Sequence, residues 1–446
     1  MIALNKYTMQ KRLFFSILSG CLLTVVLLVA CKKDSGDVET SGAPAIESFT
    51  PTRGAGRTEI LINGKNFSGD TSEISVSING KPLKIIGANA RQIMALVPKK
   101  TGSGPLTVTI GGQTATSADL FTYQFMRTVT TFAGGGVPGY YNGKGTDAQF
   151  HFSDPVNNWY RSMGIVVDKD LNIYVADPGN HCIRKIDPEG NVTLFAGAPG
   201  VSGYADGKGA EARFSLPYGL AIDADDNVYC VDPGNWDIRK ISPDGTATTL
   251  GFAPGSPWGI AVNKVTGILY YTCTDAGSIY SIPVAGGSST KVAEGLSYPA
   301  GIAVDESGNL YAAISGEQVI RKFTAGSWAS AVIAGTPNVA GYANGAGDKA
   351  MFAYPWGLAI DEGGNLYVGT NGTWNGDPSV GDQSVRMIRA NTWEVDPFAG
   401  SDVSGYADAI GTNAKFSAPI GVTADKNGTV YVMDKNNNAV RKIVSE

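Results

Sequence analysis

One short motif recurs six times between residues 164 and 425 and limits the fold more than any other feature. Each copy has glycine, three apolar or small residues, and then Asp or Asn; the copies start at Gly164, Gly219, Gly259, Gly301, Gly357 and Gly421. In the second copy, residues 219–223 (GLAID) precede further short runs at 228–232, 238–241 and 246–250, with turn residues between them. Runs this short, bounded by Gly, Pro, Asn and Asp, are typical of strands. Each repeat therefore predicts a four-stranded antiparallel sheet.

The spacing of the motif predicts how these sheets assemble. Successive copies begin 40 to 64 residues apart, and four-stranded units repeated at such intervals are typical of a β-propeller. The last repeat stops after Val440–Ile443 without a fourth strand, whereas Val129–Gly134 matches the fourth strand at Val192–Gly197. Because this pairing would remove an exposed sheet edge, we expect residues 129–134 to complete the last blade. The prediction is an all-β fold with a six-bladed propeller over residues 126–446.

The repeats resemble NHL repeats. Gly357–Asp361 (GLAID) and Gly364–Val368 (GNLYV) in one repeat and Ile183–Ile186 (IRKI) in another carry the resemblance, which covers roughly residues 127–446. It implies the same propeller architecture. The composition suits a chain rich in strands and turns, because 58 of the 446 residues are glycine and only 17% are charged.

The first 30 residues predict a signal peptide. Two basic residues precede an apolar or small-residue run at 13–30, which is just long enough to span a bilayer. The end of this run, Leu28–Cys31 (LVAC), resembles the lipobox of bacterial lipoproteins, which implies cleavage and a lipid on Cys31. We therefore expect an outer-membrane lipoprotein of the cell envelope, exposed at the surface and held to the membrane by this lipid. An uncleaved anchor is the alternative. Residues 31–43 are polar and predict a disordered tether.

Residues 44–125 predict a second all-β unit, an immunoglobulin-like sandwich. Alternating runs separated by turn residues give the strand candidates 58–63, 73–78, 82–86, 92–97 and 106–110. The stretches Pro51–Gly54, Ile60–Phe67 and Phe121–Tyr123 resemble the IPT/TIG domain, which implies a spacer or a contact module. Only residues 124–127 separate it from the first propeller strand, so we expect a direct junction at the outer edge of the last blade.

Charge and motif content narrow the function. The net charge is -5 and no basic tract is present, which argues against nucleic acid as a partner. No catalytic residue, metal site or cofactor is predicted, because the chain has only two histidines and no Gly-x-Ser-x-Gly motif. Acidic turns such as Asp168–Asn172 are interpreted as hairpin caps and not as calcium loops. Asp177 with Arg184, and Asp232 with Arg239, predict ion pairs inside blades.

Four crossings between blades carry an insertion that begins Gly-Tyr. Each insertion is followed by an aromatic residue: Phe150, Phe214, Phe352 or Phe416. We interpret the repeated Tyr and Phe as buried rings that seal adjacent blades.

The candidate ligand site lies on the face that carries the crossings between blades and the loops between second and third strands, called the loop-rich face below. The residues just before the motif glycines should ring the axial channel there: Met163, Tyr218, Trp258, Ala300, Trp356 and Ile420. Aromatic faces beside Asn and Asp suit sugar rings, through stacking and directed hydrogen bonds. The predicted ligand-binding residues are Tyr218, Trp258, Trp356, Trp236, Trp374, Trp159 and Tyr160. The alternative is that the large rings plug the channel mouth.

These features predict a lipid-anchored cell-envelope protein that binds glycan or another small polar ligand and is not an enzyme. Two alternatives stay open. Some propeller enzymes, such as lactonases and lyases, hold a metal in the axial channel, so a hydrolase or lyase is one alternative. The other is a scaffold for an outer-membrane transporter.

Overall fold

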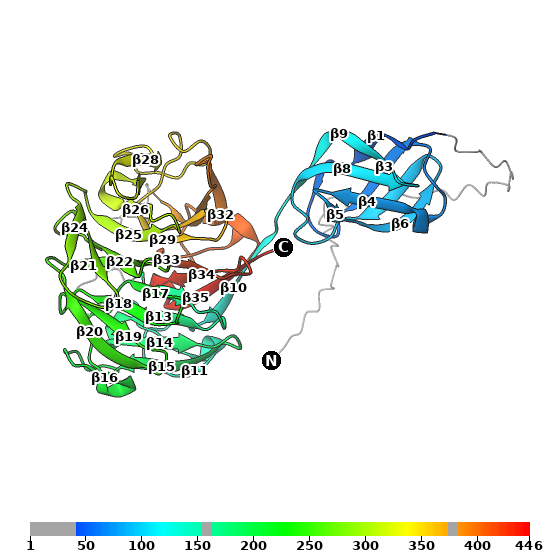
Figure 1. Ribbon diagram of the computed structural model, residues 1–446. Coiled ribbons are helices and arrows are strands. Elements are labelled where there is room, and N and C mark those ends of the chain that lie inside the picture. The colour runs from blue at the N-terminus through cyan, green and yellow to red at the C-terminus, as the bar shows by residue number, and fades with distance from the viewer. Residues whose placement is uncertain (1–41, 154–162, 373–380) are drawn as a thin grey trace, which may run out of the picture.

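The computed structural model describes residues 42–153, 163–372 and 381–446, which form two all-β units (Figure 1). The first is an immunoglobulin-like sandwich. One sheet contains β1 (Ala45–Thr50), β3 (Glu59–Lys65), β7 (Gln92–Leu96) and β6 (Lys84–Asn89). The other contains β2 (Arg53–Gly54), β9 (Gln113–Tyr123), β8 (Gly104–Ile110), β4 (Ile74–Ile78) and β5 (Lys81–Pro82). Alternate residues of both sheets fill the core, as the period-2 pattern requires. In the described ranges, no helix is long and apolar enough to cross a membrane.

The described residues between 127 and 446 form six antiparallel sheets, here called blades 1 to 6 and given from the innermost strand outwards. Blade 1 contains β12 (Ile165–Val167), β13 (Ile173–Asp177), β14 (Cys182–Ile186), β15 (Asn191–Gly197) and β11 (Gly143–Lys144). Blade 2 contains β17 (Leu220–Ile222), β18 (Val228–Asp232), β19 (Asp237–Ile241), β20 (Thr246–Phe252) and β16 (Gly207–Lys208). Blade 3 contains β21 (Pro257–Asn263), β22 (Ile268–Cys273), β23 (Ser278–Pro283) and β24 (Thr290–Ala293).

The other three blades repeat the same meander. Blade 4 contains β25 (Pro299–Val304), β26 (Leu310–Ile314), β27 (Val319–Phe323) and β28 (Ser330–Ala334). Blade 5 contains β29 (Pro355–Ile360), β30 (Leu366–Thr370), β31 (Gln383–Ile388) and β32 (Val395–Ser401). Blade 6 contains β33 (Pro419–Ala424), β34 (Val430–Asp434), β35 (Ala439–Ser445) and, from the other end of this region, β10 (Arg127–Ala133).

The propeller ring is closed both by contacts between the inner strands and by strand pairing in the outer part of blade 6. The inner strands contact one another in the order β12, β17, β21, β25, β29 and β33, and β33 contacts β12 again. At the outside, β10 pairs antiparallel with β35, from Arg127 opposite Ser445 to Ala133 opposite Val440. The predicted completion of the last blade by the first propeller strand is therefore confirmed. Blade 6 has no unpaired outer strand left over from the last repeat.

Close contact between the inner strands explains the motif glycine. An ideal Cβ on Gly164 would lie 2.0 Å from the Tyr218 carbonyl oxygen, and one on Gly357 would lie 2.0 Å from that of Ile420. The other four motif glycines approach the next blade's backbone in the same way, at 2.2 to 2.8 Å. A side chain cannot occupy these positions unless the inner strands move apart.

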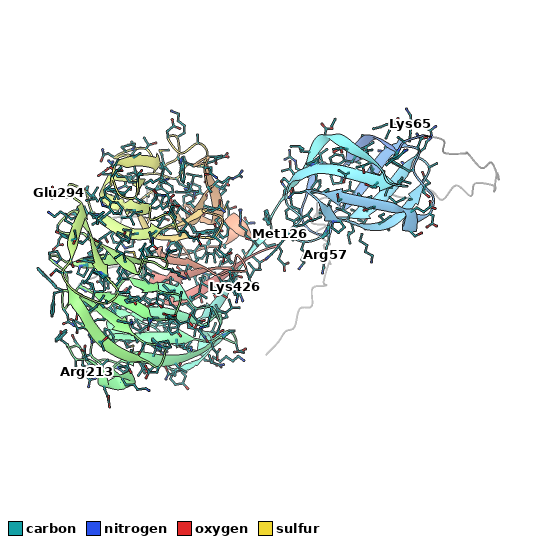
Figure 2. The ribbon with its side chains drawn as sticks, viewed as in Figure 1. Arg57, Lys65, Met126, Arg213, Glu294 and Lys426 are labelled. Carbon is teal, nitrogen blue, oxygen red and sulfur yellow. The ribbon has the colours of Figure 1, made fainter. Side chains whose placement is uncertain are left out.

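The two units meet directly. The backbones of Met126 and Glu446 exchange two hydrogen bonds of 2.9 Å. Lys99 Nζ lies 2.6 Å from the Glu446 carboxylate, and Lys100 Nζ donates to the Asn427 carbonyl oxygen at 3.2 Å. Figure 2 shows Met126 between the two units. The expected junction at the outer edge of the last blade is confirmed, because β10 is the outermost strand of blade 6.

The acidic turns are hairpin caps, as predicted. The Asp168 carboxylate accepts hydrogen bonds from the backbone N–H of Asp170 at 2.9 Å and of Asn172 at 2.8 Å, and from the Tyr174 hydroxyl at 3.2 Å. Equivalent carboxylates bind an Asn and a Tyr in three more blades: Asp223, Asp305 and Asp361. These bonds use the carboxylate oxygens to hold the turn between the first and second strands.

Candidate functional site

The residues before the motif glycines converge over the propeller axis and are buried there. All six belong to one apolar cluster. The Tyr218 and Trp258 ring centroids are 6.0 Å apart, and those of Trp258 and Trp356 are 5.5 Å apart. The predicted convergence is confirmed, but the expectation of solvent-facing rings is wrong for these three residues. Because the inner strands approach so closely, the rings pack against each other and plug the channel mouth, which was the alternative interpretation.

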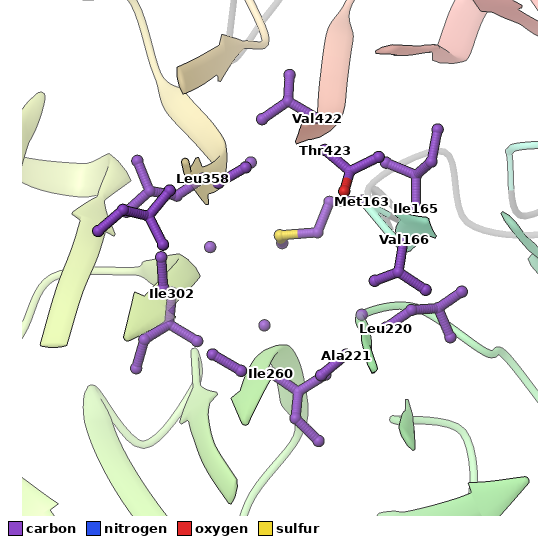
Figure 3. Close-up of a pocket in the computed structure, with 18 of the residues that line it drawn as sticks. Met163, Ile165, Val166, Leu220, Ala221, Ile260, Ile302, Leu358, Val422 and Thr423 are labelled. Carbon is purple, nitrogen blue, oxygen red and sulfur yellow. The ribbon is translucent and has the colours of Figure 1, made fainter. Parts of the chain in front are cut away.

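The axial channel opens on the opposite face of the propeller. A cavity of 210 Å³ is lined by the inner strands of the six blades, and Figure 3 shows the Met163 side chain pointing towards the middle of this ring. A second cavity of 320 Å³ lies among the turns that follow, at Asp168, Asp223, Asp361 and Asp425. In the part of the chain that the structure describes, no three His, Cys, Asp or Glu side chains are grouped so as to hold a metal ion.

Exposed aromatic side chains occur instead in the outer part of blade 2, on the loop-rich face. Trp236 is 53% exposed, Phe252 60% and Tyr204 52%. The Tyr204 and Phe252 rings lie 6.0 Å apart. The backbone oxygen of Trp236 accepts a hydrogen bond of 2.8 Å from Ala253, the residue after Phe252. These three residues are called the blade 2 aromatic surface below.

Polar groups border the aromatic surface. Thr249 Oγ1 donates to the Tyr204 hydroxyl at 3.1 Å and lies 2.9 Å from the Asp206 carboxylate. Arg239 is buried and holds the same carboxylate at 2.9 Å, yet the Asp206 side chain remains 51% exposed. A flat apolar face beside a fixed carboxylate and a hydroxyl is the combination that orients a polar ring-shaped ligand.

Trp236 occupies a backbone position that rarely carries a large side chain. Its φ is +57°, in the left-handed region that Gly and Asn tolerate best. At the equivalent position of other blades a polar side chain reaches the neighbouring blade: Gln318 accepts from the Tyr354 N–H at 2.6 Å and Asn438 from the Phe152 N–H at 3.2 Å. Within the described residues Trp236 makes no such bridge. Strained residues that serve no local bond are concentrated at functional sites.

The predicted blade ion pairs are present in blade 1 but changed in blade 2. Arg184 lies 3.1 Å from Asp177, and both are fully buried. In blade 2, however, Arg239 pairs with Asp206 and lies 3.7 Å from Asp237, so the predicted pair with Asp232 is not among its salt bridges in the described chain. Blade 2 differs in having an additional buried carboxyl group, Asp237, beside this arginine. Burial, together with the nearby Asp232, raises the pKa of Asp237 to about 8.

The insertions at the crossings have buried phenylalanines and more open tyrosines than expected. Phe150, Phe214, Phe352 and Phe416 are fully buried, as predicted. Tyr204 and Tyr406 are exposed, which corrects the expectation of a buried Tyr. Their rings cover the guanidinium groups of Arg239 and Arg441 instead, with 5.6 and 5.0 Å between the charge centre and the ring centroid. A ring that covers a buried cation from outside keeps its other face in solvent.

Some of the predicted site residues lie outside the described part of the chain, and two exposed rings were not predicted. Trp159, Tyr160, Trp374 and Cys31 lie outside the described residues. Of the predicted ligand-binding residues within it, only Trp236 is exposed. Phe252 and Tyr204 are exposed rings that were not predicted from the sequence. The available signal was that the fourth-strand segments of blades 1 and 5 contain Phe-Ala-Gly, at residues 195–197 and 398–400, whereas blade 2 has Leu-Gly-Phe at residues 250–252.

Comparison with known proteins identifies both units. Residues 44–124 match the family model described as IPT/TIG domain, and residues 164–186 and 416–443 match the model described as NHL repeat. The chain thus carries an IPT/TIG domain followed by NHL repeats in a β-propeller. The resemblances to the IPT/TIG domain and to NHL repeats are confirmed.

Relatives and solved structures agree on the fold. NHL repeat-containing protein 2 of Gallus gallus is 25% identical over 312 residues, which are 63% of this chain and 38% of that protein. The chain spans 29% to 38% of the lengths of the first curated relatives it matches.

Two solved structures from Bacteroides thetaiotaomicron extend over both units. A structural genomics protein of unknown function has a TM-score of 0.62 at 20% identity, covering 91% of this chain and 99% of that chain. An auxiliary nutrient binding protein has a TM-score of 0.57 at 19% identity, covering 92% and 99%. At these identities the similarity concerns the fold alone.

Proposed function

We propose that the chain is a lipid-anchored binding protein of the cell envelope that recognises glycan through the blade 2 aromatic surface. The observation that carries this proposal is the pair of exposed rings, Tyr204 and Phe252, beside the Asp206 carboxylate. Trp236 is a third exposed ring, at the start of the neighbouring strand β19. Stacking on such rings gives a sugar apolar contact, while a fixed carboxylate accepts hydrogen bonds from its hydroxyl groups. The similarity to an auxiliary nutrient binding protein supports a binding role, at the level of the fold.

The arrangement of the two units suits a protein held by its N-terminus. Ala45, near the start of the described chain, pairs with Lys65. Figure 2 has Lys65 at the end of the immunoglobulin-like unit that faces away from the propeller. In Figure 1, β16 and β20 of blade 2 lie on the side of the propeller that is away from that unit. An anchor at Cys31 would therefore leave the blade 2 aromatic surface far from the membrane, where a polysaccharide can reach it.

A glycan array tests the binding proposal, followed by calorimetric titration of the best ligand. Phe252→Gly introduces the glycine that blade 1 has at the equivalent position, Gly197. We expect it to weaken binding of the best ligand by about 1–3 kcal/mol and to leave the melting temperature nearly unchanged. Absence of any array ligand would refute the proposal. The anchor is tested separately, since Cys31→Ser should accumulate an unprocessed precursor without lipid, and mass spectrometry of an unmodified mature N-terminus would contradict it.

A further inference from the structure

A carboxyl group that other blades lack lies beneath the blade 2 aromatic surface. The third strand of blade 2 begins with Asp237, whereas four other blades begin it with an uncharged residue: Cys182, Ser278, Val319 and Ala439. The fold therefore accepts a small neutral side chain at this position, and the acid is not needed to build a blade.

Asp237 is buried without a hydrogen-bond partner. Its residue is fully buried, and neither carboxyl oxygen has a partner among the described residues. The nearest cation is Arg239, whose Nε is 3.7 Å away and is also unbonded. The terminal nitrogens of Arg239 are engaged elsewhere, by the Asp206 carboxylate and by the carbonyl oxygens of Ala205 and Arg213. A buried acid without hydrogen-bond partners destabilises the fold. The presence of Asp237 therefore indicates a role other than stability.

The carboxyl group and the exposed rings share one face of the sheet. Asp237 lies directly opposite Phe252 across the strand pair β19–β20, and residues directly opposite each other project to the same side. Arg239, two residues further along β19, projects to that side as well. The ring of Tyr204 contacts both Phe252 and the Arg239 guanidinium. Asp237 is therefore covered by side chains that line the ligand surface.

We propose that the ligand of the blade 2 aromatic surface carries a protonated amine, as an amino sugar does, and that Asp237 is the group that selects it. This inference rests on the proposed function. Aromatic faces attract a cation, and an ammonium group that passes the Phe252 ring would give the Asp237 carboxylate the charge-assisted hydrogen bond that it lacks. Phe252 is 60% exposed, so its ring can turn aside at little cost.

The charged groups around Asp237 determine how binding depends on pH. Asp232 on β18 faces it from the neighbouring strand, Arg239 lies on its own strand, and Asp206 approaches from the insertion; the Cys230 thiol on β18 is the other titratable neighbour. Two carboxylates besides Asp237 thus surround a single arginine, which favours the entry of one more positive charge. Because Asp237 is protonated at neutral pH in the free protein, with a pKa near 8, amine binding should release its proton.

A glycan array of matched pairs, one member with a free amine and the other N-acetylated, tests this inference on the full-length protein. We expect the ligands to be the free amines, with acetylation weakening binding by about tenfold or more. Asp237→Ser introduces the serine that begins the third strand of blade 3, Ser278. It should abolish the preference for the free amine without weakening binding of the acetylated glycan. Its melting temperature should not fall, so any loss of binding is not a loss of folding.

The outcomes separate the inference from the proposed function. Neutral or acetylated glycans that bind as tightly as the amines would overturn the inference and leave glycan binding intact. A preference for the amine that survives in Asp237→Ser would overturn the role of Asp237. No binding to any printed glycan would refute the proposed function, and the inference with it.

Discussion

Blades 2 and 6 share one framework. In blade 2, Arg239 bonds the Asp206 carboxylate of the insertion at 2.9 Å, and in blade 6, Arg441 bonds Asp408 at 2.6 Å. A threonine of the outer strand joins the insertion's Tyr and Asp in both blades, Thr249 in one and Thr131 in the other. These contacts lock the insertion onto its blade, so their repetition belongs to the stability of the ring.

The two blades differ at three adjacent positions. Blade 2 has Trp236, Asp237 and Phe252 where blade 6 has Asn438, Ala439 and Gly134. Asn438 bonds the next blade and Ala439 is a small buried residue, so each of these two serves packing. The blade 2 residues expose rings and bury an acid that has no hydrogen-bond partner among the described residues. A repeat that keeps its framework and loses local packing at one point marks that point as a candidate site of function.

The largest expected effect concerns the buried plug, which contrasts with the exposed rings of blade 2. Trp356→Ala should lower the free energy of unfolding by about 3–5 kcal/mol, because it removes a fully buried ring from the axial cluster. Trp236→Ala, the matched exposed tryptophan, should change it by less than about 0.5 kcal/mol. Urea denaturation of both variants measures this. Equal losses would show that the two tryptophans do not differ in role.

Introducing the blade 2 residue into blade 6 should also destabilise the protein. Gly134 has a φ of +94°, and a Cβ there would lie 2.4 Å from the Asn438 carbonyl oxygen. We expect Gly134→Phe to cost about 3 kcal/mol, from backbone strain and steric overlap together. Thermal and urea unfolding would report it. If the variant is as stable as the wild type, blade 6 can adopt the blade 2 arrangement, and Phe252 would then not mark blade 2 as different.

Asp237→Ser should stabilise the protein in a pH-dependent way. In the wild type, the raised pKa of Asp237 means that the folded state holds a proton that the unfolded state releases, so its contribution to stability is lost as pH rises from 3.8, the ordinary value, to about 8. The variant should therefore gain stability relative to wild type as the pH rises across that range, with the largest difference at its upper end. Melting temperatures from pH 5 to pH 9 give the measurement. A constant difference between variant and wild type would contradict the assigned titration.

The periodic parts of the structure were predictable because each repeat confirms the others. Six motif glycines at recurring places predict inner strands that touch, and the fourth-strand pattern at residues 129–134 predicts how the ring closes. The exposure of a given ring was not predictable from the repeat. In the sequence, Trp258 and Trp356 occupy the repeat position expected at the channel mouth, but in the structure their rings pack together in one buried cluster.

The blade 2 surface was only partly predictable, for a different reason. It depends on departures from the repeat and not on the repeat itself. Phe252 stands where blades 1 and 6 have a glycine at positive φ, and Asp237 stands where small neutral residues are usual. Trp236 was predicted because a tryptophan in a loop is rare and suggests a binding residue. Phe252 ends a strand, where a phenylalanine is usually a core residue, and its exposure became evident only from the structure.

Titration of the best array ligand against Trp236→Ala and Tyr406→Ala tests the central claim most directly. Both rings lie on the surface, at 53% and 45% exposure, but only Trp236 belongs to the blade 2 aromatic surface. We predict that Trp236→Ala weakens binding by about 1–3 kcal/mol, while Tyr406→Ala binds as the wild type does. Unchanged affinity in Trp236→Ala would contradict the assignment of the ligand site to blade 2.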